Sequence, residues 1–100
     1  MATTQIKHLQ ITVRGAVQGV FFRASTKAVA DQIRVRGFVM NQHDGSVYIE
    51  AEGDRFALDQ FLEWCHEGPD KALVENVETH EGKVKNYRNF EVVKKPTSLT

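Results

Sequence analysis

Residues 15–23 read GAVQGVFFR, and this stretch separates two different sequence patterns. An alternating, strand-like run precedes it, and a helix-like run follows it. Two glycines with a short apolar step between them allow a loop whose backbone N–H groups point inward around an anion. The beginning of the helix adds unpaired N–H groups and the positive end of the helix dipole. Arg23 falls in the first turn of this helix, where its guanidinium can bind two phosphate oxygens, so the stretch predicts a phosphate-binding loop.

Periodicity alone supports a purely structural explanation of these glycines about as well as a phosphate-binding one. Glycine also occurs wherever the chain must turn between a strand and a helix. The loop is not a Walker A loop, since no Gly-Lys-Ser/Thr follows it. It also differs from the dinucleotide-binding fingerprint in glycine number and spacing.

The residues on either side of the loop predict a strand and a helix. Residues 6–14 alternate, and Leu9, Ile11 and Val13 share one face, which is typical of a half-buried strand. The period then changes, and a helix is predicted from Phe22 to about Arg34. Its apolar stripe is formed by Phe22, Thr26, Val29 and Ile33.

A hairpin is predicted next. Residues 35–41 are apolar and β-prone, Asp44-Gly45 is a hairpin-turn signal, and alternation resumes from Val47. In this third strand, Glu50 and Glu52 fall on the face opposite the apolar residues. We therefore expect both carboxylates to face solvent, since nothing else in the sequence supports a catalytic carboxylate pair.

The rest of the chain predicts one more helix and two strands. Asp54 is a candidate N-cap for a helix over 55–66, which Gly68-Pro69 terminates. Its buried stripe is predicted to contain Leu58, Phe61, Leu62 and Cys65. Residues 72–80 predict a fourth strand with a possible bulge, 81–88 a polar connection, and Phe90 with Val92 a short last strand.

This order of elements predicts an α+β fold of the ferredoxin-like split β-α-β type, with a short extra strand. Two helices would cover one face of an antiparallel sheet. We expect residues 1–100 to form a single domain with a core of about 6–94 and a loose tail at 95–100.

Composition excludes several classes of partner and location. Thirteen basic and thirteen acidic residues cancel, so there is no basic excess for a nucleic-acid surface. One cysteine cannot form an internal disulfide, and no apolar run has the length of a signal sequence core or a membrane span. These features predict a cytoplasmic protein that binds neither nucleic acid nor membrane.

Two motifs resemble those of the acylphosphatase family. GAVQGVFFR matches the pattern G-x-V-Q-G-V-x-F-R, and GFVMNQHDGSV matches G-x-V-x-N followed by a D-G-x-V turn. Later segments, GPDKALVENVE and YRNFEVV, also match in kind, so the resemblance covers nearly the whole chain. It independently implies the split β-α-β fold. It also implies a small acyl phosphate as substrate, a monomer, inorganic phosphate or another anion in the loop, and neither cofactor nor metal.

The resemblance assigns roles to particular residues. Arg23 corresponds to the family's phosphate-binding arginine, and Asn41 to its water-positioning asparagine; both are predicted to be catalytic. The predicted phosphate-binding set is continuous: Gly15, Ala16, Val17, Gln18, Gly19, Val20, Phe21, Phe22 and Arg23. In a split β-α-β fold the first two strands run in the same direction, so the loop and Asn41 are expected at the same end of the sheet.

The implied reaction is hydrolysis of a carboxyl–phosphate anhydride. Its leaving group is a carboxylate, which needs no general acid, and a loose phosphoryl-transfer transition state asks little of the nucleophile. The tasks that remain are holding the phosphoryl group, stabilising its oxygens and placing one water in line. The substrate phosphate itself is a hypothetical acceptor for the proton of that water.

Other residue types offer weaker candidates for chemistry. The histidines are scattered and show no metal-ligand spacing: His8, His43, His66 and His80. His43 is read as a surface turn residue, Cys65 as a buried small hydrophobe, and Ser25 and Thr26 as helix-surface and core residues.

Three other functions are conceivable from the sequence, and the first of them fails in detail. RGFVMN at 36–41 partly resembles an RNA-recognition signature, but the following aromatic is missing and the strand is the wrong one. A non-catalytic phosphate-binding or small-molecule regulatory module on the same fold is the main alternative. The third is an acylphosphatase-like domain of a larger protein, acting in partner binding or carbamoyl-phosphate chemistry.

Overall fold

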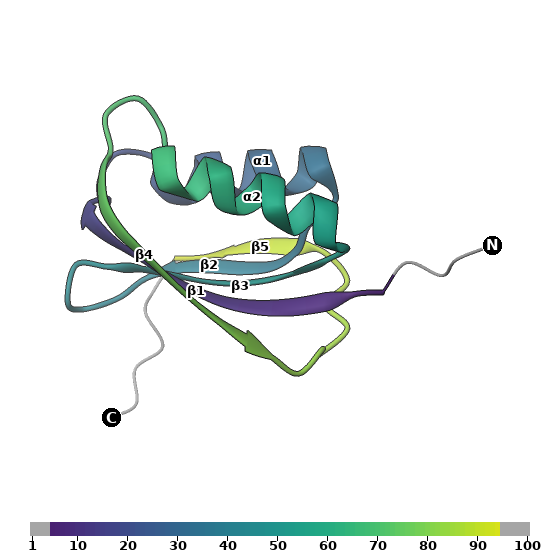
Figure 1. Ribbon diagram of the computed structural model, residues 1–100. Coiled ribbons are helices and arrows are strands. Elements are labelled where there is room, and N and C mark those ends of the chain that lie inside the picture. The colour runs from purple at the N-terminus through teal and green to yellow at the C-terminus, as the bar shows by residue number, and fades with distance from the viewer. Residues whose placement is uncertain (1–4, 95–100) are drawn as a thin grey trace.

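A computed structural model of the protein describes residues 5–94, and the tail predicted for 95–100 lies outside them. Two helices form one layer and five strands form the other (Figure 1). In chain order the elements are β1 (Lys7–Ala16), α1 (Phe22–Ile33), β2 (Arg36–Asn41), β3 (Val47–Gly53), α2 (Arg55–Glu67), β4 (Leu73–Gly82) and β5 (Phe90–Val93). Neither helix among the described residues has the length and apolar character needed to cross a membrane.

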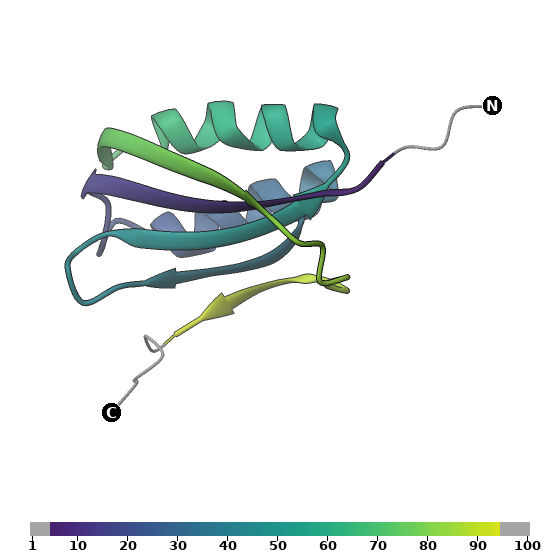
Figure 2. The same ribbon diagram turned by 60° about the horizontal axis from the view of Figure 1, so that its bottom comes forward.

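The strands lie side by side in the order β4-β1-β3-β2-β5 (Figure 2). β1 and β2 are both antiparallel to β3, so they run in the same direction with β3 between them. This arrangement confirms the predicted ferredoxin-like split β-α-β fold. The expectation of a purely antiparallel sheet was wrong for one strand, because β5 pairs in parallel with β2. The chain crosses the sheet between β4 and β5, so β5 begins at the same end as β2.

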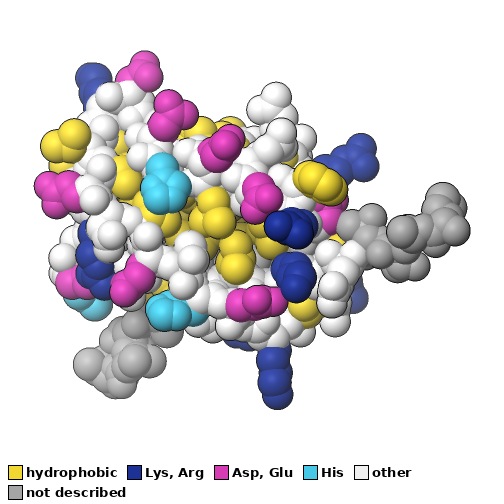
Figure 3. Space-filling model, viewed as in Figure 1, with side chains coloured by type: hydrophobic (Ala, Val, Ile, Leu, Met, Phe, Trp, Pro, Cys, Tyr) yellow, Lys and Arg dark blue, Asp and Glu magenta, His cyan; other side chains and the backbone are white. Residues whose placement is uncertain are grey.

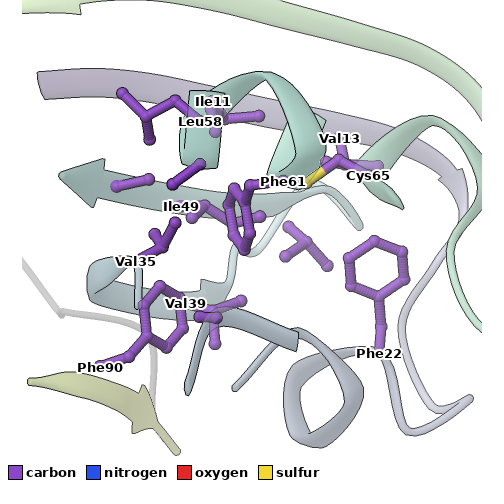
Figure 4. Packing of buried hydrophobic residues seen from close by; sticks show 14 of the residues in the cluster. Ile11, Val13, Phe22, Val35, Val39, Ile49, Leu58, Phe61, Cys65 and Phe90 are labelled. Carbon is purple, nitrogen blue, oxygen red and sulfur yellow. The ribbon is translucent and has the colours of Figure 1, made fainter. Parts of the chain in front are cut away.

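The predicted alternation places one side of each central strand under the helices. Ile11 and Val13 of β1 are fully buried, and so are Val47 and Ile49 of β3. The ring of Phe61 lies at the centre of this core (Figure 4). Its centroid is 5.9 Å from the ring centroid of Phe90 in β5.

The helices pack on the sheet through the stripes that the sequence predicts. Leu58, Phe61 and Cys65 of α2 are buried, and Leu62 is partly buried. On α1, Phe22 and Thr26 are buried. Apolar side chains also gather across the middle of the face that Figure 3 shows, with acidic and basic side chains above and below them.

The turns and helix ends follow local sequence signals. Asp54 caps α2, since its Oδ1 accepts a hydrogen bond from the Ala57 N–H at 2.8 Å. The predicted bulge in β4 is also confirmed, because the pairing shifts between Arg14 and Gly15 of β1. At this bulge Gly15 has φ +134, and a Cβ there would lie 2.1 Å from the Leu73 carbonyl oxygen, so a larger residue does not fit.

The prediction that Glu50 and Glu52 face solvent was wrong. Glu52 is fully buried and Glu50 is nearly so, on the sheet face that the helices leave free. The polar segment 83–89 crosses this face and covers them. The Glu52 carboxylate accepts hydrogen bonds from the backbone N–H groups of Lys85 and Tyr87. Alternation alone could not show this, because the covering segment lies far away in the sequence.

These carboxylates belong to a wider hydrogen-bonded network that includes partly buried and exposed side chains. We call it the open-face cluster, consisting of His8, Tyr48, Glu50, Glu52, Lys85 and Tyr87. His8 Nδ1 lies 2.7 Å from Glu52, and both tyrosine hydroxyls donate to Glu50, at 2.7 and 2.6 Å. Burial alone would raise the pKa of Glu50, but hydrogen bonds from Tyr87, Tyr48 and Lys85 outweigh it and hold that pKa below its ordinary value. The hydrogen bonds of this network hold segment 83–89 on the sheet.

Candidate active site

A pocket of about 600 Å³ lies at the end of the sheet where β1, β2 and β5 end and α1 begins. In Figure 1 this is the end of the molecule that carries the turn between β2 and β3. The split β-α-β topology brings these chain segments together, because β1 and β2 point the same way. The pocket is lined by Val17, Gly19, Phe21, Phe22, Arg23, Ala24, Asn41, Val92 and Lys94.

The loop between β1 and α1 forms one wall of the pocket. Val17 is fully buried in the core and anchors the beginning of the loop. Gly19 follows with φ +74, and Phe21 precedes the helix with φ +60. Left-handed residues of this kind turn successive N–H groups toward one side, as anion-binding nests do.

The N-terminus of α1 is free to receive an anion. Phe21 occupies the N-cap position and makes no side-chain hydrogen bond to the helix, and no acidic residue lies in the first turn. The first N–H groups of an α-helix have no partner within the helix and carry its positive partial charge. With no cap and no carboxylate among the described residues to satisfy them, they suit a phosphate group.

Gln18 ties this loop to the turn between β2 and β3. Its side-chain amide donates hydrogen bonds to the carbonyls of Gln42 at 2.7 Å and Ser46 at 2.8 Å. The turn itself is held by Asp44, whose Oδ1 accepts from the Ser46 N–H at 2.9 Å. The Ser46 side chain, its backbone and Arg14 together lower the pKa of the Asp44 carboxyl. Gln18 therefore holds the loop against the strand that ends at Asn41.

Arg23 is held from the other side by the end of β5. Its Nη1 donates to the carbonyls of Val93 at 3.0 Å and Lys94 at 3.2 Å. Lys27, one turn further along α1, donates to the Phe90 carbonyl at 2.9 Å and fixes the beginning of β5. Within residues 5–94 the hydrogen bonds of the Arg23 guanidinium run through Nη1 alone, so its other nitrogens can receive phosphate oxygens.

Asn41 closes the pocket at the end of β2. It pairs with Val47 across the hairpin, and its side chain lines the pocket. Its Oδ1 is buried and accepts no hydrogen bond from any described residue. A buried acceptor without a partner costs about 1–3 kcal/mol, so such an atom in a pocket points to a ligand or water that it serves.

The structure separates the predicted phosphate-binding residues into two groups. Val17, Gly19, Phe21, Phe22 and Arg23 line the pocket. Gly15 and Ala16 instead belong to β1 and pair with Val74 and Leu73 of β4, Gln18 acts as the tether, and Val20 packs against the core. The binding role of each residue remains a prediction.

Two lining residues, Val92 in β5 and Lys94 directly after it, were not predicted. Val92 and Lys94 reach the pocket because β5 joins the sheet beside β2. No local pattern in the sequence indicates this parallel pairing, so no signal pointed to them. With Lys94 in the lining, the two charged lining residues are Arg23 and Lys94. Both are cations, which favours an anionic ligand.

The weaker candidates lie where the sequence predicts. His43 is exposed in the hairpin turn, and Thr26 is buried with its hydroxyl donating to the Phe22 carbonyl at 2.7 Å. Cys65 is fully buried, and burial raises the pKa of its thiol to about 12, so it suits packing and not nucleophilic chemistry. Among residues 5–94 no group of three or more His, Cys, Asp or Glu side chains is arranged to hold a metal ion.

Comparison with known proteins agrees with this geometry. The family model described as Acylphosphatase matches residues 9–92. A curated protein of Thermotoga maritima named acylphosphatase is 47% identical over 87 residues, which cover 87% of this chain and 97% of the relative. One of Archaeoglobus fulgidus, also named acylphosphatase, is 45% identical over 84 residues, covering 84% and 94%.

Solved structures give the same result. An acylphosphatase from Coxiella burnetii is 37% identical with a TM-score of 0.87, and the alignment covers 93% of this chain and all of that one. A full-length HypF, in a phosphate- and nucleotide-bound form, is 30% identical with a TM-score of 0.83, but the match covers only 13% of its chain. The motifs, the fold and the matches over nearly the whole chain agree, and this chain belongs to the acylphosphatase family.

Proposed function

We propose that this protein is an acylphosphatase that hydrolyses the carboxyl–phosphate bond of small acyl phosphates to a carboxylate and inorganic phosphate. One observation carries the proposal. A single pocket combines an uncapped helix N-terminus, the guanidinium of Arg23 and the unpartnered Oδ1 of Asn41. Family membership and the names of the curated relatives support an enzyme over a non-catalytic binding module.

The loop and Arg23 bind the phosphoryl group. Backbone N–H groups of the loop and of the first turn of α1 donate to its oxygens, while Arg23 contributes two further donors and a full positive charge. Charge spreads over the equatorial oxygens as the bond to the leaving group lengthens. Arg23 is already held in place by the carbonyls of Val93 and Lys94, so it stabilises that charge with little reorganisation.

Asn41 orients the attacking water. Its Oδ1 accepts a hydrogen bond from a water molecule and thereby directs a lone pair of that water at phosphorus. The water oxygen forms the new P–O bond, and the bond between phosphorus and the acyl oxygen breaks. The carboxylate leaves with the electron pair; one proton of the water passes to a phosphate oxygen, and the other stays on the oxygen of the new P–O bond. No step requires a metal ion or a protein general acid.

The oligomeric state, the cellular location and inhibition by the product are also proposals. We infer a monomeric, cytoplasmic protein, in line with the single buried cysteine and the balanced charge. Inorganic phosphate, the product, is expected to occupy the same loop and to inhibit competitively. The physiological acyl group is taken up below.

The test is acetyl phosphate hydrolysis combined with inhibition by inorganic phosphate. Arg23→Ala should lower kcat/KM by about 10²–10³ and weaken phosphate inhibition, because it removes a donor to the transition state. Asn41→Ala should lose turnover by a similar factor while phosphate still binds. Arg55→Ala and Asn76→Ala, at exposed positions outside the pocket, are matched controls that should behave as wild type.

Two results would overturn parts of this proposal. Full activity in the Arg23 variant would remove Arg23 from the site. Equal losses of turnover and of phosphate affinity in the Asn41 variant would mean that Asn41 binds the anion and does not orient water.

A further inference from the structure

Two consecutive phenylalanines have opposite environments at the beginning of α1. Phe22 is 2% exposed and packs against Trp64, with ring centroids 5.4 Å apart and the rings tilted by 53°. Phe21 is 81% exposed and yet lines the pocket. The core therefore accounts for Phe22 and leaves the large apolar side chain of Phe21 unexplained.

The backbone at Phe21 deepens this contrast. Its φ of +60 lies in the left-handed region, which a bulky residue rarely adopts and which glycine or asparagine adopts readily. Phe21 thus combines an unfavourable backbone conformation with an apolar ring in water, directly at the N-cap of the helix. Strain of this kind concentrates at ligand-binding positions.

The chemistry of an acyl phosphate divides the pocket into two parts. The charged phosphoryl group belongs with the loop N–H groups and Arg23. The acyl group is joined through the anhydride oxygen and is the neutral half of the molecule, so it must extend toward the open side. There the exposed ring of Phe21, with Val92 also lining the pocket, offers an apolar surface.

We propose that Phe21 contacts the acyl group of the substrate and makes the enzyme prefer aryl acyl phosphates, with benzoyl phosphate as the representative probe, over small aliphatic ones. This inference rests on the proposed function. The ring would stack on an aromatic acyl group and exclude water from it, a contact that a methyl group cannot make. Phe21 is then a specificity residue, while Arg23 and Asn41 act on the phosphoryl group.

The experiment compares kcat/KM for benzoyl phosphate and acetyl phosphate in each protein and uses the ratio as the readout. Phe21→Gly and Phe21→Asn both suit a positive φ and remove the ring. We expect the benzoyl-to-acetyl ratio to fall about 2- to 12-fold in both, the factor that one aromatic contact of about 0.5–1.5 kcal/mol gives. Phe21→Tyr should keep the wild-type ratio, because it keeps the ring.

The matched control is Phe56, another phenylalanine with an 82% exposed side chain, in the first turn of α2 and outside the pocket. Phe56→Ala should change neither rate nor the ratio. An unchanged ratio in both ring-deleted Phe21 variants would overturn the inference and leave the proposed function standing. Wild-type protein that hydrolyses neither substrate would overturn the proposed function, and the inference with it.

Discussion

Replacing Glu52 by glutamine tests whether the open-face cluster holds the segment 83–89 on the sheet. The wild-type carboxylate accepts three hydrogen bonds, from the N–H groups of Lys85 and Tyr87 and from Nδ1 of His8. Lys85 and His8 share one oxygen, and Tyr87 uses the other at 3.0 Å. A glutamine has only one oxygen, so its NH₂ group must face at least one donor, which leaves a buried N–H without an acceptor.

The expected loss follows from this count of donors and acceptors. An unsatisfied buried N–H costs about 1–3 kcal/mol, and the remaining bonds weaken when the acceptor loses its charge. We therefore expect Glu52→Gln to lower the free energy of unfolding by about 2–4 kcal/mol. For a domain of this size about 1 kcal/mol corresponds to 4–8 °C in Tm, so the midpoint should fall by roughly 8–32 °C.

The stabilisation that the Glu52 carboxylate contributes should also decrease toward acid pH. Burial alone would raise the pKa of Glu52, but its hydrogen bonds from Lys85, His8 and Tyr87 outweigh burial and hold that pKa below the ordinary value of 4.5. The unfolded chain then binds the proton more readily than the folded one. The stabilisation is fully present above about pH 5 and is lost as the pH falls through the folded pKa. The difference between wild type and Glu52→Gln should therefore shrink below pH 4.5.

Urea unfolding followed by the fluorescence of Trp64, the single tryptophan, measures both effects. Glu81→Gln is the matched control, because Glu81 is exposed on β4 and among the described residues it pairs with Lys7 alone, at 3.4 Å, a surface pair of about 0–1 kcal/mol. A loss in Glu52→Gln no larger than in this control would refute the reasoning. So would a difference that stays constant down to pH 3.

Three further predictions use other features of the fold. Gln18→Ala should cost about 1–2 kcal/mol of stability and lower kcat/KM for acetyl phosphate, because the loop loses both hydrogen bonds to the hairpin turn; unchanged kinetics would show that the tether is dispensable. Gly37→Ala should prevent stable folding, since a Cβ there would lie 1.8 Å from the Glu50 carbonyl oxygen. Gly45→Ala, also at positive φ but with open space around it, should cost only about 1–2 kcal/mol; equal thermal stability of the two variants would contradict this. Cys65 should not react with a thiol reagent at pH 8 in the folded protein and should react fully in urea, because burial raises the pKa of its thiol to about 12; rapid labelling of native protein would refute this.

Local periodicity was sufficient to predict most of the fold. The alternation around Ile11 and Ile49 and the stripe through Phe61 depend only on which face of an element is apolar, and all three are buried as expected. The convergence of the loop, Arg23 and Asn41 followed from the order of the elements, because a split β-α-β unit fixes the direction of its first two strands.

The remaining features depend on contacts between distant segments. Glu52 has the polar character and the alternating position of a solvent-facing residue, and only the passage of segment 83–89 across the sheet buries it. Val92 and Lys94 enter the pocket through the parallel pairing of β5 with β2, which no local pattern encodes. The different environments of Phe21 and Phe22 likewise depend on where the helix begins to within one residue.

The central claim is that water, oriented by Asn41, attacks the phosphorus of an acyl phosphate held by the loop and Arg23. Hydrolysis of acetyl phosphate in ¹⁸O-labelled water with EDTA present, run on wild type beside Arg23→Ala, tests it most directly. The account predicts sustained turnover in wild type, one labelled oxygen in the inorganic phosphate, unlabelled acetate, and loss of the reaction in the variant. Label in the acetate, or turnover that survives the loss of Arg23, would contradict it.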